Sequence, residues 1–357
     1  MNILYLNNTM ILGGGVQKCV YLLAKNFSEE NKVIVASSGG EYVEELKDNN
    51  IEHIEIINPE KKDPISLTIN IHRLYKLVKK NKIDIIHSHH RMTTLYARIL
   101  SKLLNVKVTH TAHLYTTDKK YLTKWSLRNL PIISVSNGVR QGLIGFYGLN
   151  KNNIKTIYNT MEFNSENALI LEKYKNELIN KQFIVGVVSR LEPVKGIDII
   201  LEASKHLGED IKIFIFGEGK LKEEFNKYIT ENNLSNVILM GKVSNISDYM
   251  KNFDVIIQSS YQEGLPLSLI EASYLGIPII ATNIPGTNEV VINDYNGILV
   301  EVGSSEEIKK AIVELYNNEE KRKTYSINSE LYFKKNFSQK KYYTNHLSFY
   351  NSLLEKH

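Results

Sequence analysis

Short β-rich runs alternate with segments of helical periodicity along the chain, and this alternation limits the possible folds more than any other feature. Strands separated by helices pair in parallel, so the pattern predicts two parallel α/β sheets. The strands expected in the first half are Ile3–Asn7, Lys32–Ser37, Ile51–Ile57, Ile83–His87, Lys107–Thr111, Ile132–Ser136 and Ile154–Asn159. Those expected in the second half are Phe183–Ser189, Ile211–Phe216, Val237–Met240, Val255–Ser259, Pro278–Thr282 and Gly297–Val302.

The domain boundary is expected near the start of a polar stretch, 162–182, that shows no strand pattern. A length of 357 residues exceeds one ordinary domain core and supports two domains. We expect a first domain at 1–165 and a second domain at 166–338. A C-terminal helix at 339–357 is expected to pack back toward the first domain. A further helix is expected at 168–178. The C-terminal helix carries an apolar stripe of Tyr343, Leu347, Tyr350 and Leu354.

Charge is divided unevenly between the two halves. Residues 1–165 hold 22 Lys and Arg against 13 Asp and Glu, a net charge of +9, and the remainder holds 22 against 26, a net charge of −4. The basic half predicts an anionic partner such as a lipid surface or a phosphate-bearing acceptor. The single cysteine, Cys19, is expected in the core and fits a reducing cytosol. Because the sequence shows no signal peptide and no run of 18 uncharged apolar residues, we expect a cytoplasmic protein.

The strongest motif is EGLPLSLIEAS at 263–273, which follows an expected strand and opens a helix. Glu263 lies in the loop and Glu271 lies about one turn into the helix, whose free N-terminal amides attract a phosphate. Both carboxylates are suited to accept hydrogen bonds from sugar or ribose hydroxyls. The alternative is that Glu263 complements the helix dipole and that Glu271 is a solvated helix residue.

A second motif, SRLEPVKG at 189–196, directly follows another expected strand. Arg190 and Lys195 are two cations at the strand end that can clamp a diphosphate and neutralise its charge as it leaves. A plain pair of surface cations is the alternative. After the next strand, Gly217-Glu218-Gly219 forms a turn where the backbone can approach a nucleotide closely.

In the first half, Gly13-Gly14-Gly15 lies between the first strand and the first helix. Successive glycines there let backbone amides approach a ligand, although a flexible loop is the alternative. His113 follows the strand Lys107–Thr111 and is either a ligand contact or a structural histidine.

Three histidines close together, His87, His89 and His90, raise the question of a metal site. No Asp-x-Asp pair and no nearby cysteine completes a cation site, and Asp84 is expected on the strand face opposite His87. We therefore expect no metal.

Together these motifs resemble those of the family 4 retaining glycosyltransferases, which have the GT-B fold. The matching features are an R-x4-K-G segment that begins at Arg190, two glutamates at Glu263 and Glu271, and a histidine at His113. The resemblance continues through Gly217-Glu218-Gly219, Gly286, Glu289 and Asn296-Gly297. It implies two Rossmann-like domains that face each other across a cleft.

The implied activity is transfer of a sugar from a nucleoside diphosphate donor, with UDP favoured, to an acceptor hydroxyl with retained configuration. The implied acceptor belongs to cell-surface polysaccharide or lipid-linked oligosaccharide synthesis. No cofactor is implied, because the nucleotide sugar is a substrate. A GT-B relative that phosphorolyses or hydrolyses a glycoside stays an alternative.

The resemblance also implies a role for each matching residue. Arg190 and Lys195 would bind the donor diphosphate. Glu263 would contact the sugar hydroxyls, Glu271 the ribose, and His113 the edge of the transferred sugar. The other residues expected in the donor site are Gly14, Gly15, Gly217, Gly264, Leu265 and Leu267. Gln17 stands where many relatives carry a glutamate.

Two functions of other classes fit the sequence less well. A nicotinamide dehydrogenase is disfavoured because Lys18 stands at the third glycine position and the second strand ends in Ser37-Ser38, without an acid for the ribose. Nucleic-acid binding would rest on the basic charge alone, because no helix-turn-helix, finger or stacking-strand motif is found.

One basic segment suggests where the protein works. Lys120, Lys124 and Arg128 recur at four-residue spacing, and Tyr121 and Trp125 form a neighbouring stripe. Basic residues beside aromatic ones suit an anionic membrane surface, which predicts a peripheral position at the inner face of the membrane. The alternative is a solvated helix with Trp125 packed into its own domain.

Overall fold

The computed structural model describes residues 1–61, 63–115, 120–162, 182–243 and 245–355, so the helix expected at 168–178 lies outside the described residues. The chain divides into two compact units. The first holds Met1–Met161 together with Gln339–His357, and the second holds Glu162–Ser338. The chain therefore leaves the first unit once and returns to it at its C-terminal end.

Seven parallel strands form the sheet of the first unit in the order β3-β2-β1-β4-β5-β6-β7. They are β1 Asn2–Leu6, β2 Lys32–Ser37, β3 Glu52–Glu55, β4 Ile85–Ser88, β5 Lys107–Ala112, β6 Ile132–Ser134 and β7 Ile154–Thr156. In the centre of the sheet, Ile3 pairs with Val33 of β2 and with Ile85 of β4. Each of the seven strands overlaps a predicted one.

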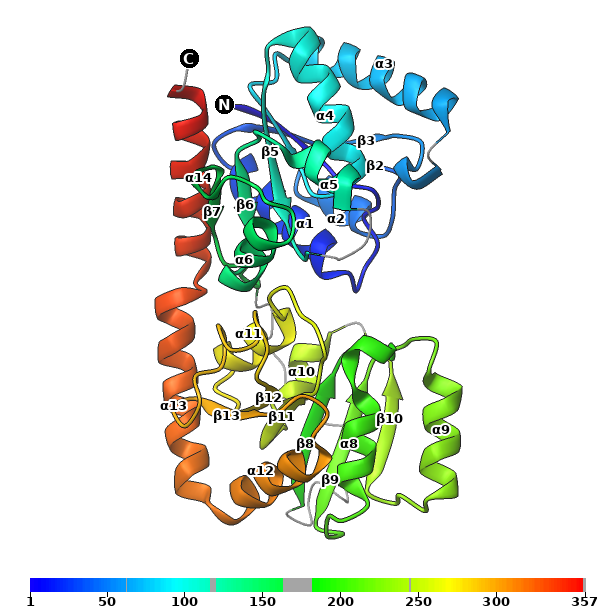
Figure 1. Ribbon diagram of the computed structural model, residues 1–357, viewed down its shortest axis with the longest axis vertical. Coiled ribbons are helices and arrows are strands. Elements are labelled where there is room, and N and C mark those ends of the chain that lie inside the picture. Colours follow the sequence, from blue (N-terminus) through cyan, green and yellow to red (C-terminus); the bar gives the residue numbers. More distant parts are fainter. Residues whose placement is uncertain (62, 116–119, 163–181, 244, 356–357) are drawn as a thin grey trace. The chain divides into compact units, whose positions relative to one another are not determined.

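Helices cover both faces of this sheet, because side chains alternate along each strand. Ile3 and Tyr5 of β1 belong to one core cluster with α1, α2 and α14, whereas Leu4 and Leu6 belong to another with α3 and α4. In Figure 1, α14 and the pair α3–α4 lie on opposite sides of the strands. The helices are α1 Gly15–Ser28, α2 Tyr42–Asp48, α3 Pro64–Asn81, α4 Arg91–Leu104, α5 Lys120–Leu127, α6 Asn137–Gly145 and α14 Gln339–Glu355.

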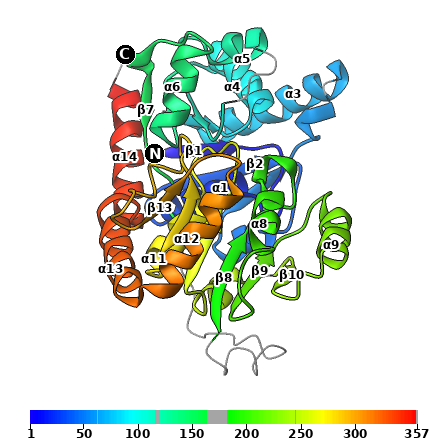
Figure 2. The same ribbon diagram turned by 60° about the horizontal axis from the view of Figure 1, so that its bottom comes forward.

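The second unit has a six-stranded parallel sheet in the order β10-β9-β8-β11-β12-β13. Its strands are β8 Phe183–Val188, β9 Ile211–Phe216, β10 Val237–Gly241, β11 Val255–Gln258, β12 Ile279–Thr282 and β13 Gly297–Val300. Its helices are α8 Ile197–Ser204, α9 Lys222–Glu231, α10 Ile246–Met250, α11 Leu267–Tyr274, α12 Ser305–Asn317 and α13 Glu319–Asn336. Residues of α8, α9 and α12 share one core cluster with the sheet, and α8 lies beside α12 in Figure 2.

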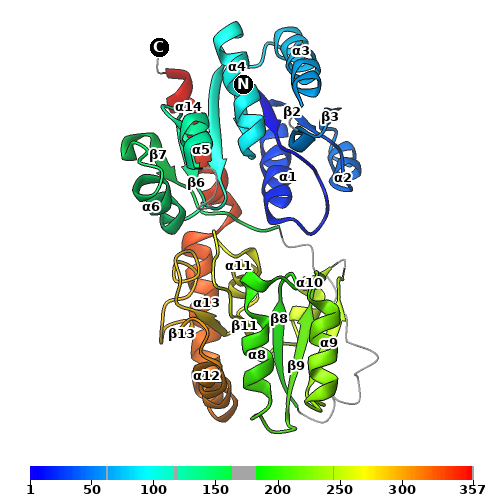
Figure 3. The ribbon, with the colours of Figure 1, turned by 45° about the vertical axis from the view of Figure 1, so that its right-hand side comes forward.

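The remaining helices of the second unit include α11 and α13, which pack against each other. Figure 3 shows α8 and α9 in front of β8 and β9. Among the described residues, no helix is both long and apolar enough to cross a membrane. Cys19 is buried in α1, and burial raises the pKa of its thiol to about 12, so the expected core position is confirmed.

Helix α14 joins the core of the first unit, but not by the whole expected stripe. The residues it buries are Tyr342, His346, Phe349, Tyr350 and Leu353. Leu354 is 36% exposed, so the expected stripe is wrong at that position. Apart from Tyr350, each buried residue precedes an expected one by one position. The sequence pattern does not reveal this face, because the residue in the middle of it is the polar His346.

Tyr350 fixes α14 to the centre of the sheet. Its hydroxyl lies 2.6 Å from Nδ1 of His87 at the end of β4 and 3.3 Å from the hydroxyl of Tyr5 in β1. All three side chains are fully buried. Buried polar groups of this kind contribute stability only as long as each keeps a partner.

We predict that Tyr350→Phe lowers the free energy of unfolding by about 1–3 kcal/mol, because His87 loses a buried hydrogen-bond partner. Urea unfolding followed by the fluorescence of Trp125, the only tryptophan, would measure the change in the first unit. Tyr343→Phe is the matched control, since its hydroxyl bonds to Glu30 at the surface and its loss should cost less than about 0.5 kcal/mol. Equal effects of the two variants would contradict the assignment.

Candidate active site

The two motifs of the second unit meet at the carboxyl ends of β8 and β11, which are neighbours where the strand order reverses. Ligands of open parallel sheets bind at such a point. The loop after β8 contains a short 3-10 turn, Pro193–Lys195, and α8 begins directly after Gly196. The hydroxyl of Ser259, just after β11, donates to the carbonyl oxygens of Lys195 at 3.1 Å and Gly196 at 2.7 Å. The two loops are thereby held together.

Lys195 and Glu263 form an ion pair between these loops. The distance from Nζ of Lys195 to Oε1 of Glu263 is 2.6 Å, and the two side chains are only 16% and 10% exposed. The same carboxylate accepts hydrogen bonds from the hydroxyl of Ser260 at 2.6 Å and from the amide of Gln258. A poorly solvated charge needs such partners, and removal of one partner leaves the other charge uncompensated.

Glu271 lies one turn into α11 and is 4% exposed, with the hydroxyl of Ser247 in α10 donating to its carboxylate. The alternative that Glu271 is a solvated helix residue is therefore wrong. The reason is that this face of α11 lies against α10, a contact across 24 residues of sequence. Gly264 and Leu265 are buried and Leu267 is half-buried at the start of the helix.

Arg190 differs from Lys195 in its surroundings. It is exposed, and the described residues offer its guanidinium no hydrogen bond or ion pair, so its donors are available to an anion. Gly217 sets the path of its loop: the residue has φ of 142°, and a Cβ there would lie 1.9 Å from the carbonyl oxygen of Ser189. A Cβ on Gly219 would lie 2.3 Å from the carbonyl oxygen of Leu191. These glycines thus allow close packing against the Arg190 loop.

The glycine segment of the first unit follows β1 and leads into α1, where Gly14 is the N-cap residue and Gly15 the first helical one. A Cβ on Gly14 would lie 2.0 Å from Oε1 of Gln17, whose amide donates to the hydroxyl of Thr9 at 3.0 Å. A side chain at position 14 would therefore have to displace the end of the Gln17 side chain, which folds back over Gly14.

Five histidines form a cluster in and next to the carboxyl-terminal parts of β4 and β5. They are His87, His89, His110, His113 and His346. Nδ1 of His89 lies 3.0 Å from Nε2 of His113, while Nδ1 of His110 lies near the hydroxyls of Ser88 and Thr94. Burial lowers the pKa of His110 and His113 to about 3 and that of His346 to about 4, and it places the pKa of His87 and His89 well below the ordinary value. All five are neutral at pH 7.

Both nitrogens of His87 are already engaged, by Tyr350 and by the hydroxyl of Thr111 at 2.7 Å. Asp84 accepts a hydrogen bond from the backbone amide of Asn2. Within the described part of the chain, no group of three or more His, Cys, Asp or Glu side chains is arranged to hold a metal ion.

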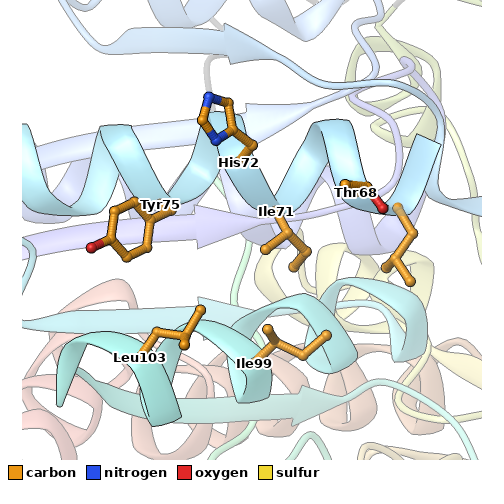
Figure 4. A pocket seen from close by; sticks show the side chains of 7 residues that line it. Thr68, Ile71, His72, Tyr75, Ile99 and Leu103 are labelled. Atoms are coloured by element: carbon orange, nitrogen blue, oxygen red, sulfur yellow. The ribbon is translucent and has the colours of Figure 1, made fainter. Parts of the chain in front are cut away.

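An apolar cavity lies elsewhere in the first unit. It has a volume of about 400 Å³ and is lined by residues of α3 and α4, including Ile71, Tyr75 and Leu103. Figure 4 shows Ile99 and Leu103 of α4 opposite Ile71 of α3, with His72 directed away from them. It contains none of the expected site residues.

The structure thus brings together Lys195 and Glu263, and places Arg190 and Glu271 on neighbouring loops and helices of the same unit. Gly14, Gly15 and His113 belong to the other unit. Sequence reasoning missed the residues that hold the glutamates, namely Gln258, Ser260 and Ser247. Gln258 could have been found from the sequence, because it is a polar residue at the end of an apolar strand. Nothing in the sequence around Ser247 indicates its contact with Glu271.

Comparison with known proteins identifies relatives over both units. The model of Glycosyltransferase Family 4 matches residues 13–163, and that of Glycosyl transferases group 1 matches residues 171–332. The UDP-Gal:α-D-GlcNAc-diphosphoundecaprenol α-1,3-galactosyltransferase of Escherichia coli is 32% identical over 265 residues, which cover 67% of this chain and 68% of the relative. The capsular polysaccharide biosynthesis glycosyltransferase CapM of Staphylococcus aureus is 26% identical over 91% of this chain and 90% of its own.

A solved structure, HepE of Anabaena in complex with UDP-glucose, matches with a TM-score of 0.87 and 19% identity over 99% of this chain and 100% of that one. This likeness, with the two parallel sheets, confirms the expected two-domain α/β fold of the GT-B class.

The buried histidines predict a loss of stability in mild acid. Their pKa in the folded chain lies below the ordinary value near 6.5, so the unfolded chain takes up protons first as the pH falls. Each histidine should lower the free energy of unfolding by up to about 1.4 kcal/mol per pH unit below about pH 6.5, until its folded pKa is reached.

Urea unfolding between pH 7.5 and 5.5, followed by Trp125 fluorescence, measures this slope. His110→Gln should reduce the slope, whereas His72→Gln, at an exposed position, should leave it unchanged. A slope that is the same in all three proteins would disprove the assignment to the buried histidines.

Proposed function

The chain belongs to the family 4 glycosyltransferases, and on that premise we propose that it moves a sugar from UDP, or another nucleoside diphosphate, to an acceptor hydroxyl with retained configuration. The named activity of the Escherichia coli relative supports a UDP-sugar donor and a lipid-linked acceptor. The UDP-glucose complex of HepE also supports a UDP-sugar donor. The name of CapM, a capsular polysaccharide biosynthesis glycosyltransferase, supports a cell-surface polysaccharide as the product.

The observation that carries the proposal is the arrangement of Arg190, Lys195 and Glu263 at the carboxyl ends of β8 and β11. Transfer breaks the bond between the sugar C1 and the diphosphate oxygen, and the electron pair of that bond leaves with the diphosphate. The acceptor oxygen forms the new bond to C1, and its hydroxyl proton is released. Positive charge held in place beforehand stabilises that departing group. Arg190 and Lys195 supply this charge, so the reaction needs no metal ion.

The remaining residues orient the donor. Glu263, held by Lys195, Ser260 and Gln258, accepts hydrogen bonds from the sugar hydroxyls. Glu271, held by Ser247, accepts them from the ribose. His113 contacts the edge of the transferred sugar, and Gly14, Gly15, Gly217, Gly264, Leu265 and Leu267 complete the donor site.

The test is a panel of UDP-, GDP- and ADP-sugars with a lipid-linked acceptor, read by mass spectrometry of the glycosylated product and by release of nucleoside diphosphate. We expect a UDP-sugar to react, with the same rate in excess EDTA. Lys195→Ala should lower kcat by about 10²–10⁴. Lys323→Ala, which removes an exposed ion-paired lysine on α13, is the control and should have no effect.

Product formation only with inorganic phosphate or water, in place of an acceptor, would point to a phosphorylase or hydrolase instead. Turnover of Lys195→Ala within about threefold of the wild type would refute the role of the lysine. Activity that EDTA abolishes and Mg²⁺ or Mn²⁺ restores would refute metal independence.

We also propose that α5 places the first unit on an anionic membrane surface. Tyr121 is 87% exposed and Trp125 is 56% exposed, so Trp125 packs only in part against its own domain, where the guanidinium of Arg98 lies 5.9 Å from the centre of its ring. Lys120, Lys124 and Arg128 are exposed beside them. Cations near an anionic surface contribute about 1 kcal/mol each, and aromatic side chains enter the interfacial region.

Sedimentation with anionic and neutral liposomes should show binding to the anionic ones, weaker at high salt, with a shift in Trp125 fluorescence. Replacing Lys120, Lys124 and Arg128 with Glu should abolish it. The control replaces Lys310, Lys323 and Lys334, each about 70% exposed in the second unit, with Glu and makes the same change in net charge. Equal losses in both triple variants would show a nonspecific charge effect and end the proposal.

A further inference from the structure

Two histidines follow neighbouring strands and are joined in series. His89 comes directly after β4 and His113 directly after β5, and the two strands pair in parallel with Ser88 opposite His110. Both side chains therefore lie at the carboxyl edge of the sheet. Nδ1 of His89 and Nε2 of His113 are 3.0 Å apart, a hydrogen-bond distance, so one of the two nitrogens carries the shared proton.

The environment of His89 limits the choice between the two arrangements. The side chain is 5% exposed, and its ring lies 4.3 Å from that of His87, centre to centre. Its other nitrogen, Nε2, is buried and has no hydrogen-bond partner among the described residues. A proton on Nε2 would leave a buried N–H donor without an acceptor, which folded proteins avoid more strictly than an unfilled acceptor. The proton of His89 therefore belongs on Nδ1, the nitrogen that faces His113.

This choice fixes the state of the second ring. If Nδ1 of His89 donates, Nε2 of His113 must accept, and a neutral His113 then carries its own proton on Nδ1. Nδ1 is the nitrogen of His113 that does not face His89 in this contact, and it has no hydrogen-bond partner among the described residues. His113 is more exposed than His89, so this N–H is the end of the pair that a ligand can reach.

We propose that His89 is a positioning residue that holds His113 in the Nδ1–H tautomer, so that the site presents a hydrogen-bond donor at this point. The ligand at this point is the sugar of the donor, and this part of the inference rests on the proposed function. The group recognised is a hydrogen-bond acceptor, such as a hydroxyl oxygen of that sugar. His89 itself does not touch the substrate.

The tautomer can be measured without any substrate. Protein labelled with ¹⁵N-histidine gives long-range ¹H–¹⁵N spectra in which protonated and unprotonated ring nitrogens have well-separated shifts, and His113→Asn assigns the His113 signals. We expect a protonated Nδ1 and an unprotonated Nε2 for His113 in the wild type. A protonated Nε2 would overturn the proposal, whatever the activity.

Two variants of nearly the same shape separate positioning from packing. His89→Asn keeps an N–H donor near the place of Nδ1, whereas His89→Leu removes it. We expect the Asn variant to keep the wild-type tautomer of His113 and the Leu variant to lose it. With the sugar donor identified by the panel, kcat/KM should fall about 5- to 10-fold in the Leu variant, the loss of one hydrogen bond, and by less than about threefold in the Asn variant.

An unchanged His113 tautomer in the folded Leu variant would contradict the proposal. If the Leu variant does not fold, the wild-type and Asn spectra decide, because a tautomer lost in the Asn variant would contradict it as well. A wild type that releases no nucleoside diphosphate would refute the proposed function but leave the spectra, and with them the role of His89, unaffected.

Discussion

Neighbouring parallel strands in this protein are joined by connections that cross back over their sheet. Within each sheet, the carboxyl ends of the strands therefore lie at the same end of the sheet. The faces of the sheets are covered by helices and filled with apolar side chains. Polar groups that could bind a ligand therefore lie in the loops at the carboxyl ends of the strands. The loops after β1, β4 and β5 in one unit and after β8 and β11 in the other carry the candidate residues for this reason.

The two units meet the cost of burying polar groups in different ways. The second unit buries charged groups: Lys195 forms an ion pair with Glu263, and Ser260 and Gln258 donate hydrogen bonds to the carboxylate. The first unit keeps neutral imidazoles, each near a hydroxyl, a backbone carbonyl or another imidazole. A neutral ring needs one proton in the right place, whereas a charge needs an opposite charge. The buried polar groups of the two candidate clusters are thus charged in the second unit and neutral in the first.

The strands and the two-sheet fold could be predicted because they depend on local patterns. All thirteen expected strands were found, with ends that differ by a few residues, since hydrogen bonding and not composition ends a strand. The partners of the site residues could not be predicted, because they come from distant segments: Ser247 reaches Glu271 across 24 residues, and Tyr350 reaches His87 across 263. His346 hid the true buried face of α14, because a histidine reads as polar until its burial is seen.

The return of the chain to its first unit has a consequence for synthesis on the ribosome. The second unit, Glu162–Ser338, is complete in sequence before α14 is made, and domains generally fold as units during translation. The first unit lacks Tyr342, Phe349 and Tyr350 from its core until α14 has left the ribosome. The unit whose translation begins first is therefore completed only after the second unit, and until then the sheet face that α14 joins is only partly covered, by α1 and α2.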